Sequence, residues 1–199
     1  MVVRGPNYAL RYLPAADAPA LYGLGSDPEV TRFFSWGPYA DESEARAFIE
    51  SLDRARETGE RLELAIVADN RVIGLTGLSD FSPRDGRAVV GTWLGREHWG
   101  SGANRESKAL VLAMGFRALA LNRITALASP QNVRSIAALE RLGFVHEGVL
   151  RGWHVHGGEL RDVAVLRMMR DEWEHTPLAE VPVTIESDPP PAFAYSQRK

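Results

Sequence analysis

The stretch Arg96-Glu97-His98-Trp99-Gly100-Ser101-Gly102-Ala103-Asn104 decides how the rest of the chain can be interpreted. It separates an apolar run ending near Leu94 from the apolar-striped segment 103–121, so a glycine-rich turn connects a strand to a long helix. Backbone amides at a helix start lack intrahelical partners and carry the positive end of the helix dipole. Because glycine has no β-carbon, an anion can approach such amides closely. The turn is therefore a candidate phosphate cradle.

The glycine pattern excludes two nucleotide-binding classes. No Gly-Lys-Ser/Thr follows, which excludes a Walker loop, and Arg105 stands where a dinucleotide fingerprint would place its third glycine. An ordinary strand-to-helix turn without a ligand remains an equal alternative. Several basic residues in this part of the chain offer local positive charge, although each is also a common surface residue: Arg96, Arg105, Lys108, Arg134 and Arg141.

The segments before the turn show both strand and helix patterns. Four of them predict strands: 8–13, 62–68, 72–81 and 88–94. Two others predict helices: 15–25 and 41–58. Asp69-Asn70 predicts a tight hairpin turn. The segment 31–39 is rich in aromatic residues and contains Gly37-Pro38, so we expect a loop or lid.

After the long helix, the chain continues in an α/β order. The segments 123–128 and 133–142 predict a strand and a helix, and 145–155 and 160–169 predict a closing hairpin around Gly157-Gly158. From residue 176 the chain is rich in proline, which predicts an extended tail. We therefore expect one domain over residues 1–175 and a tail over 176–199.

Composition narrows the class of protein. With 199 residues, 45% of them hydrophobic and 25% charged, the chain suits one globular domain. A net charge of -3 gives no general attraction to nucleic acid or an anionic membrane. The absence of cysteine excludes disulfides, thiolate metal sites and a cysteine nucleophile, and no metal site is expected. No signal-peptide pattern or membrane-spanning run is found, so we expect a cytoplasmic protein.

Three motifs in order carry a family resemblance. Residues 98–106 resemble an acyl-CoA loop, with Trp99 and Asn104 departing from the usual pattern. Residues 130–135, closed by 142–144, resemble an Asn-x-x-Ser helix, and 147–151 with 170–173 resemble a C-terminal pattern. On these motifs the chain from Tyr8 to Trp173 resembles the GNAT superfamily of N-acetyltransferases, especially its RimJ/RimL-like branch.

The resemblance implies the acyl-CoA N-acyltransferase fold. This is a mixed α/β sheet of about seven mostly antiparallel strands with helices on both faces, splayed between its fourth and fifth strands, 88–94 and 123–128. The pantetheine arm of acetyl-CoA would lie in the gap and pair with edge amides of Trp93 and Leu94. The cofactor-binding residues expected are Trp93, Leu94, Trp99, Gly100, Ser101, Gly102, Ala103, Asn104, Arg105, Asn132, Ser135 and Arg141.

The implied activity is transfer of the acetyl group of acetyl-CoA to a primary amine by direct attack in a ternary complex. The missing cysteine agrees with this, because it removes the commonest acyl-enzyme nucleophile. The acceptor is a protein N-terminus or a small amine, and the protein is a monomer or a homodimer. The alternative is a catalytically silent acyl-CoA-binding sensor or scaffold.

The sequence identifies catalytic residues less clearly than cofactor-binding residues. The resemblance implies that Ser135 protonates the departing thiolate and that Asn132 holds the pantetheine, but both are also ordinary helix-capping residues. Glu106 is a weak candidate for the general base, and Asp80 and His98 are open to the same doubt. An aromatic set either walls the acceptor pocket or pins a loop to the core: Phe33, Phe34, Trp36, Tyr39 and Trp153.

Overall fold

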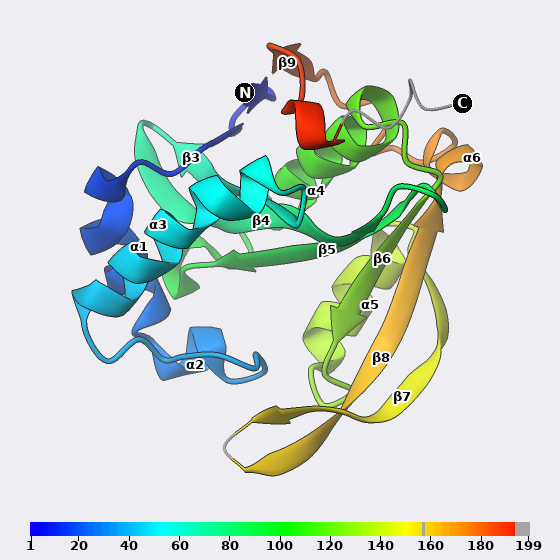
Figure 1. Ribbon diagram of the computed structural model, residues 1–199. Helices are drawn as coiled ribbons and strands as arrows, with labels where there is room; N and C mark the ends of the chain where they lie inside the picture. Colours follow the sequence, from blue (N-terminus) through cyan, green and yellow to red (C-terminus); the bar gives the residue numbers. More distant parts are fainter. Residues whose placement is uncertain (157, 194–199) are drawn as a thin grey trace.

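One mixed sheet organises the computed structural model, which describes residues 1–156 and 158–193 (Figure 1). Within these residues the strand order is β7-β8-β6-β5-β4-β3-β2-β1-β9, and only β5 and β6 are parallel neighbours. The strands are β1 (Val2–Arg4), β2 (Ala9–Arg11), β3 (Arg61–Ala68), β4 (Arg71–Ser82), β5 (Arg87–Leu94), β6 (Arg123–Ala128), β7 (Val145–His156), β8 (Glu159–Met169) and β9 (Thr184–Glu186).

Helices cover both faces of this sheet, which confirms the predicted fold class (Figure 1). They are α1 (Ala18–Gly25), α2 (Pro28–Thr31), α3 (Glu42–Glu57), α4 (Ala103–Ala113), α5 (Val133–Arg141) and α6 (Arg170–Trp173). The α1 and α3 helices pack on one face and α4 packs on the other. The described sheet has nine strands instead of about seven, because β1 and β9 extend one edge. Each has three residues, too few to show a strand period.

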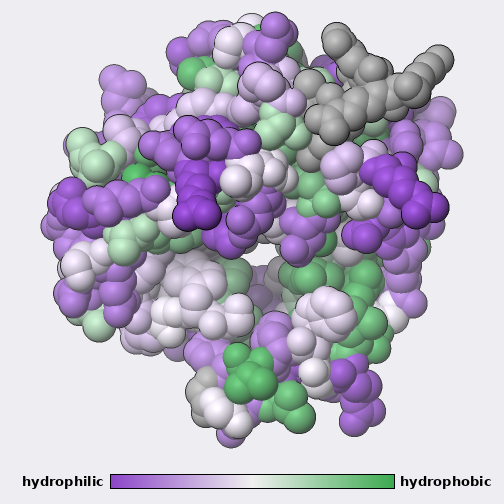
Figure 2. Space-filling view, viewed as in Figure 1, coloured by the Kyte–Doolittle hydropathy of each residue, from purple (hydrophilic) through white to green (hydrophobic). Residues whose placement is uncertain are grey.

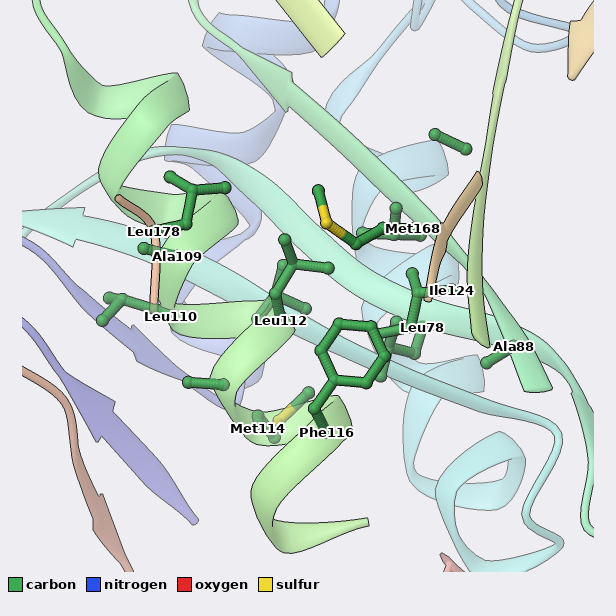
Figure 3. Close-up of a cluster of buried hydrophobic side chains, with 14 of the residues drawn as sticks. Leu78, Ala88, Ala109, Leu110, Leu112, Met114, Phe116, Ile124, Met168 and Leu178 are labelled. Atoms are coloured by element: carbon green, nitrogen blue, oxygen red, sulfur yellow. The ribbon is translucent and has the colours of Figure 1, made fainter. Parts of the chain in front are cut away.

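The larger core lies between α4 and the sheet. Figure 3 shows Leu112 and Phe116, from α4 and the turn that follows it, directed toward Leu78 of β4 and Ile124 of β6. All four side chains are buried, as the apolar stripe of segment 103–121 predicts. Ala103, the first residue of α4, is buried in the same core, so the start of the helix and the glycine turn before it are held against the sheet.

The sheet splits between β5 and β6. Their parallel register runs from Arg87 opposite Arg123 to Val90 opposite Ala126 and stops there, although β5 continues to Leu94. Past this point the two strands diverge, as expected for segments 88–94 and 123–128. Figure 2 shows an opening through the molecule between its two halves. The end of β5 therefore borders open space.

The segment predicted as an extended tail packs on the domain as far as residue 193. Strand β9 pairs with β1, and the side chains of Leu178 and Phe193 are buried in the main core. The ring of Phe193 lies 4.7 Å from that of Phe81, centroid to centroid. Pairing with β1 and burial of two apolar side chains offset the entropy of ordering this proline-rich chain. Residues 194–199 of the predicted tail, and Gly157 of the predicted hairpin turn, lie outside the described residues.

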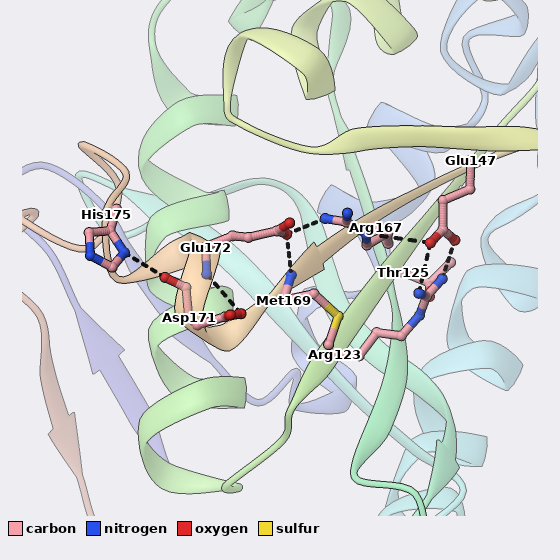
Figure 4. Close-up of polar contacts among 8 residues, drawn as sticks. All are labelled: Arg123, Thr125, Glu147, Arg167, Met169, Asp171, Glu172 and His175. Carbon is pink, nitrogen blue, oxygen red and sulfur yellow. Dashed lines mark hydrogen bonds and ion pairs between the residues drawn. The ribbon is translucent and has the colours of Figure 1, made fainter.

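An ion-pair network holds the second half of the sheet together (Figure 4). Glu147 of β7 binds Arg123 of β6 and, at 3.4 Å, Arg167 of β8, which in turn binds Glu172 of α6. The hydrogen bond from Arg123 holds the pKa of Glu147 below its usual value. The ring of buried Trp173 packs against that of Phe116 in a tilted arrangement, with 5.2 Å between the ring centroids. The C-terminal motif 147–151 and 170–173 is thus largely structural.

Among the described residues, none of the helices combines the length and the apolar character that crossing a membrane requires.

Candidate functional site

The glycine turn lies at the split end of β5 and begins α4. Gly100 has φ 78° and Gly102 has φ 90°, backbone conformations that favour glycine. No described atom outside the neighbouring residues lies within 4 Å of where a β-carbon would stand on either glycine. A side chain there would fill space that the protein leaves open, which fits a bulky phosphate-bearing ligand and not a turn packed against the protein.

Hydrogen bonds leave part of the turn's backbone available. The amide of Ala103 donates to Ser101 Oγ at 3.3 Å, and the amide of Arg105 donates to the Gly102 carbonyl at 3.0 Å. Within the described residues, the amides of Gly100, Ser101, Gly102 and Asn104 have no such partner. The cradle is thus narrower than the predicted run through Arg105. An amide cluster at a helix start suits a diphosphate.

The edge of β5 turns alternate residues toward the opening. A β-carbon on Gly74 of β4 would stand 2.2 Å from the Trp93 carbonyl, so the backbone of Trp93 faces β4. Alternation then directs the backbone of Thr92 and Leu94 toward the opening. The backbone of Trp93 is thus turned toward β4, and the backbone groups of β5 that face the opening at this end are those of Thr92 and Leu94. The Leu94 carbonyl already accepts from Trp99 Nε1 at 3.0 Å, which ties the turn to the strand.

The N-terminus of α5 faces the same turn across the split. Arg134 places its guanidinium 3.9 Å from the ring centroid of Trp99, a cation–π contact between the two halves of the site. Asn132 caps α5, because its Oδ1 accepts from the amide of Ser135 at 3.1 Å. The hydroxyl of Ser135 has no partner among the described residues, so it is free for a ligand.

Two basic residues expected to supply charge lie elsewhere. Arg141 is the last residue of α5, about 13 Å along the helix axis from its Asn132 end. Lys108 is 4% exposed beneath the sheet and donates to Thr92 Oγ1 of β5. Burial lowers the pKa of Lys108 to about 7, opposed by the attraction of Glu63. Neither side chain is available to a diphosphate at the glycine turn.

Glu106 holds the N-terminal segment in place. Its Oε1 accepts from the amides of Asn7 at 2.7 Å and Tyr8 at 2.9 Å, and its Oε2 accepts from Asn7 Nδ2 at 2.8 Å. A cavity of about 510 Å³ lies beside this contact and includes Ser101 and Arg105 in its lining. With three hydrogen bonds to one loop, Glu106 suits anchoring better than proton transfer.

Glu106→Gln is expected to lower the free energy of unfolding by about 1–3 kcal/mol, because an amide group cannot accept all three bonds. The acetyl-transfer rate constant should change less than about threefold, since no proton passes through this side chain. Chemical denaturation and steady-state kinetics on the same preparation measure both. A rate loss of more than about 100-fold with unchanged stability would restore Glu106 as the base.

The aromatic loop forms a stack against β5. Trp36 lies 5.4 Å from Phe34, 5.2 Å from Tyr39 and 5.4 Å from Trp93, between ring centroids. The indole of Trp93 is thus part of the aromatic wall, although its backbone faces β4. Trp153 does not face this stack, because its side chain is 57% exposed and strand alternation turns it away from His154. A small pocket brings His154 and His156 toward Phe33 and Phe34 instead.

The other base candidates are Asp80 and His98. Asp80 of β4 is exposed and lies near the start of β5. That end of β5 is the end still paired with β6. His98 lies in the turn and ion-pairs with Glu97 at 3.6 Å when protonated. Glu63 of β3 was not predicted as a site residue, although its side chain lies over Gly77 of β4, toward β5. Its signal was a lone carboxylate inside an apolar strand.

A split mixed sheet with an open glycine turn at a helix start is the arrangement that the resemblance to acyl-CoA N-acyltransferases implies. Residues 8–145 match the family of acetyltransferase (GNAT) domains. The chain is 36% identical over 166 residues to the uncharacterized N-acetyltransferase p20 of Bacillus licheniformis, covering 82% of this chain and 93% of that protein. With YoaA of Bacillus subtilis, named as an uncharacterized N-acetyltransferase, it shares 29% identity, covering 81% and 92%.

The fold agrees with solved structures. Mycobacterium smegmatis RimJ in complex with CoA-disulfide superposes with a TM-score of 0.82 at 20% identity, covering 89% of this chain and 91% of that one. A GCN5-related N-acetyltransferase from Brucella melitensis gives a TM-score of 0.78 at 24% identity, covering 87% and 80%. The chain belongs to the GNAT family and is an acetyl-CoA-dependent N-acetyltransferase.

Proposed function

We propose that this enzyme acetylates a primary amine by direct attack in a ternary complex. The observation that carries the proposal is the open glycine turn beside the free end of β5, where Gly100 and Gly102 leave room for a ligand and no side chain of the described residues fills it. Bound there, acetyl-CoA supplies an activated acetyl thioester. The residues of the protein hold the diphosphate at the turn, orient the thioester along Thr92 and Leu94, and transfer protons.

Ser135 and Asn132 have different roles at the N-terminus of α5. Because Asn132 fixes the amide of Ser135, it sets the direction of the first helical turn. The partly buried Ser135 hydroxyl then supplies a proton to the departing sulfur. Asn132 acts here as a positioning residue, and its capping bond and a contact with the pantetheine are compatible because its Nδ2 remains free.

Ser135→Ala is expected to lower kcat by about 10- to 1,000-fold, because the leaving sulfur loses its proton donor. The affinity for CoA should stay within about threefold, since the amide cradle lies on the other side of the split. An assay of thiol release measures kcat, and calorimetric titration with CoA measures the affinity. An unchanged kcat would remove Ser135 from the mechanism.

The alternative function is an acyl-CoA-binding sensor or scaffold. Thiol release from acetyl-CoA, followed with a panel of amines and N-terminal peptides, separates the two. Turnover that requires an amine and yields its acetylated form supports the enzyme and identifies the acceptor as a peptide N-terminus or a small amine. Tight CoA binding with no turnover across both groups would favour the silent module.

A further inference from the structure

A row of residues crosses three strands on the α1/α3 face of the sheet. The register sets Glu63 of β3 opposite Gly77 of β4, and Gly77 opposite Gly91 of β5. Two adjacent glycines leave a trough beside the carboxylate. Gly91 is also the first residue of β5 past the last pair with β6, so the trough ends where the sheet opens.

The carboxylate of Glu63 lies in this trough. A β-carbon on Gly77 would stand 2.5 Å from Glu63 Oε2, which places the carboxylate over Gly77 and one strand spacing, about 5 Å, from Gly91. No described atom beyond the chain neighbours lies within 4 Å of a β-carbon position on Gly91. Among the described residues, no hydrogen bond or ion pair engages Glu63. A partly buried carboxylate thus faces open space without a partner.

Aromatic rings border the same space. Trp93 follows Gly91 by two residues on the same face of β5, and its ring lies 5.4 Å from that of Trp36. Tyr39 completes this wall and is close enough that Glu63 contributes to its raised pKa, after burial and Glu44. Indole and phenol faces attract a cation, and a carboxylate attracts it more strongly. The combination suits an ammonium ion.

We propose that Glu63 binds the acceptor as a primary ammonium ion in the space above Gly91 and takes its proton before acetyl transfer. The inference rests on the proposed function. One proton passes from the ammonium to Glu63 Oε2 and then to solvent. The neutral nitrogen forms a bond to the acetyl carbonyl carbon, the carbon–sulfur bond breaks, and the second nitrogen proton replaces the one that Ser135 gives to sulfur.

The surroundings tune Glu63 for this role. Burial raises the pKa of Glu63 to about 7, while Arg61 of β3 and Lys108 of α4 hold it down. Tyr39 of the aromatic loop and Glu44 of α3 are further titratable groups on this side. A base that titrates near neutral pH is matched to proton transfer at that pH.

The test compares wild type, Glu63→Gln and the exposed control Glu60→Gln, with acetyl-CoA and the best primary amine of the thiol-release panel. We expect Glu63→Gln to lower kcat/KM for the amine by at least about 100-fold near pH 7. The KM for acetyl-CoA should not change. The deficit should narrow as pH rises toward about 10, because more amine is then neutral in solution. Glu60→Gln should behave as wild type.

A deficit that stays constant with pH, or an unchanged kcat/KM, would overturn the role of Glu63. If Glu63→Gln unfolds, Glu63→Asp keeps a carboxylate, and its kcat/KM should retain the wild-type dependence on pH at a reduced level. A wild-type enzyme that binds CoA but turns over no amine would overturn the proposed function itself, and this inference with it.

Discussion

Replacing Gly102 with valine is expected to weaken CoA binding by at least about 100-fold, a loss of about 3 kcal/mol. Gly102 caps α4 at φ 90°, and no described atom beyond its neighbours surrounds its β-carbon position. The new side chain would therefore collide with the ligand and not with the protein, and it would shift a strained backbone away from the diphosphate. Isothermal titration calorimetry with CoA measures the effect.

Gly158→Val is the matched control. Gly158 has φ 80° and the same open surroundings, but it lies in the closing hairpin. Both variants should lose similar thermal stability from backbone strain, about 1–2 kcal/mol. Only Gly102→Val should lose CoA affinity. Equal CoA affinity in the two variants would show that the glycine turn does not hold the cofactor.

Lys108→Met should change how stability depends on pH. The folded pKa of Lys108 is about 7, below its unfolded value of 10.5, so unfolding takes up a proton between these values. The stability of wild type relative to the variant should therefore rise with pH in this window, by about 2 kcal/mol between about pH 8 and about pH 10. Below about pH 7 the difference should be constant.

Urea denaturation at several pH values measures this difference. Arg71→Met removes an exposed cation and is the control, which should show no such pH dependence. A flat difference for Lys108→Met would mean that Lys108 keeps its proton in the folded protein.

Local signals in the sequence predicted the glycine turn, the Asp69-Asn70 hairpin and the aromatic loop. Each depends on residues adjacent in the chain, since positive φ and capping are local properties. Both Asp69 and Asn70 have positive φ, as that turn requires. The split of the sheet followed from the family resemblance, and the register confirms where it begins.

The surroundings of Glu63 and the burial of Lys108 could not be predicted from such local signals. The proposed role of Glu63 depends on Gly77, which lies opposite it, and on Gly91, which lies opposite Gly77. Strand register alone brings these three residues into one row. Lys108 lies in an amphipathic helix whose pattern suggests a solvent-exposed cation, yet tertiary packing buries it beside Thr92. The packed segment 176–193 was missed for a related reason, since proline content hides the pairing of β9 with β1.

The most direct measurement of the central claim is a titration of ¹⁵N-labelled protein with CoA, followed by amide chemical shifts. We expect the largest shifts at Gly100, Ser101, Gly102 and Asn104, with smaller shifts at Thr92 and Leu94 and none in β1 or β9. A saturating titration that leaves the amides of residues 100–104 unmoved, or the absence of any binding, would contradict the account.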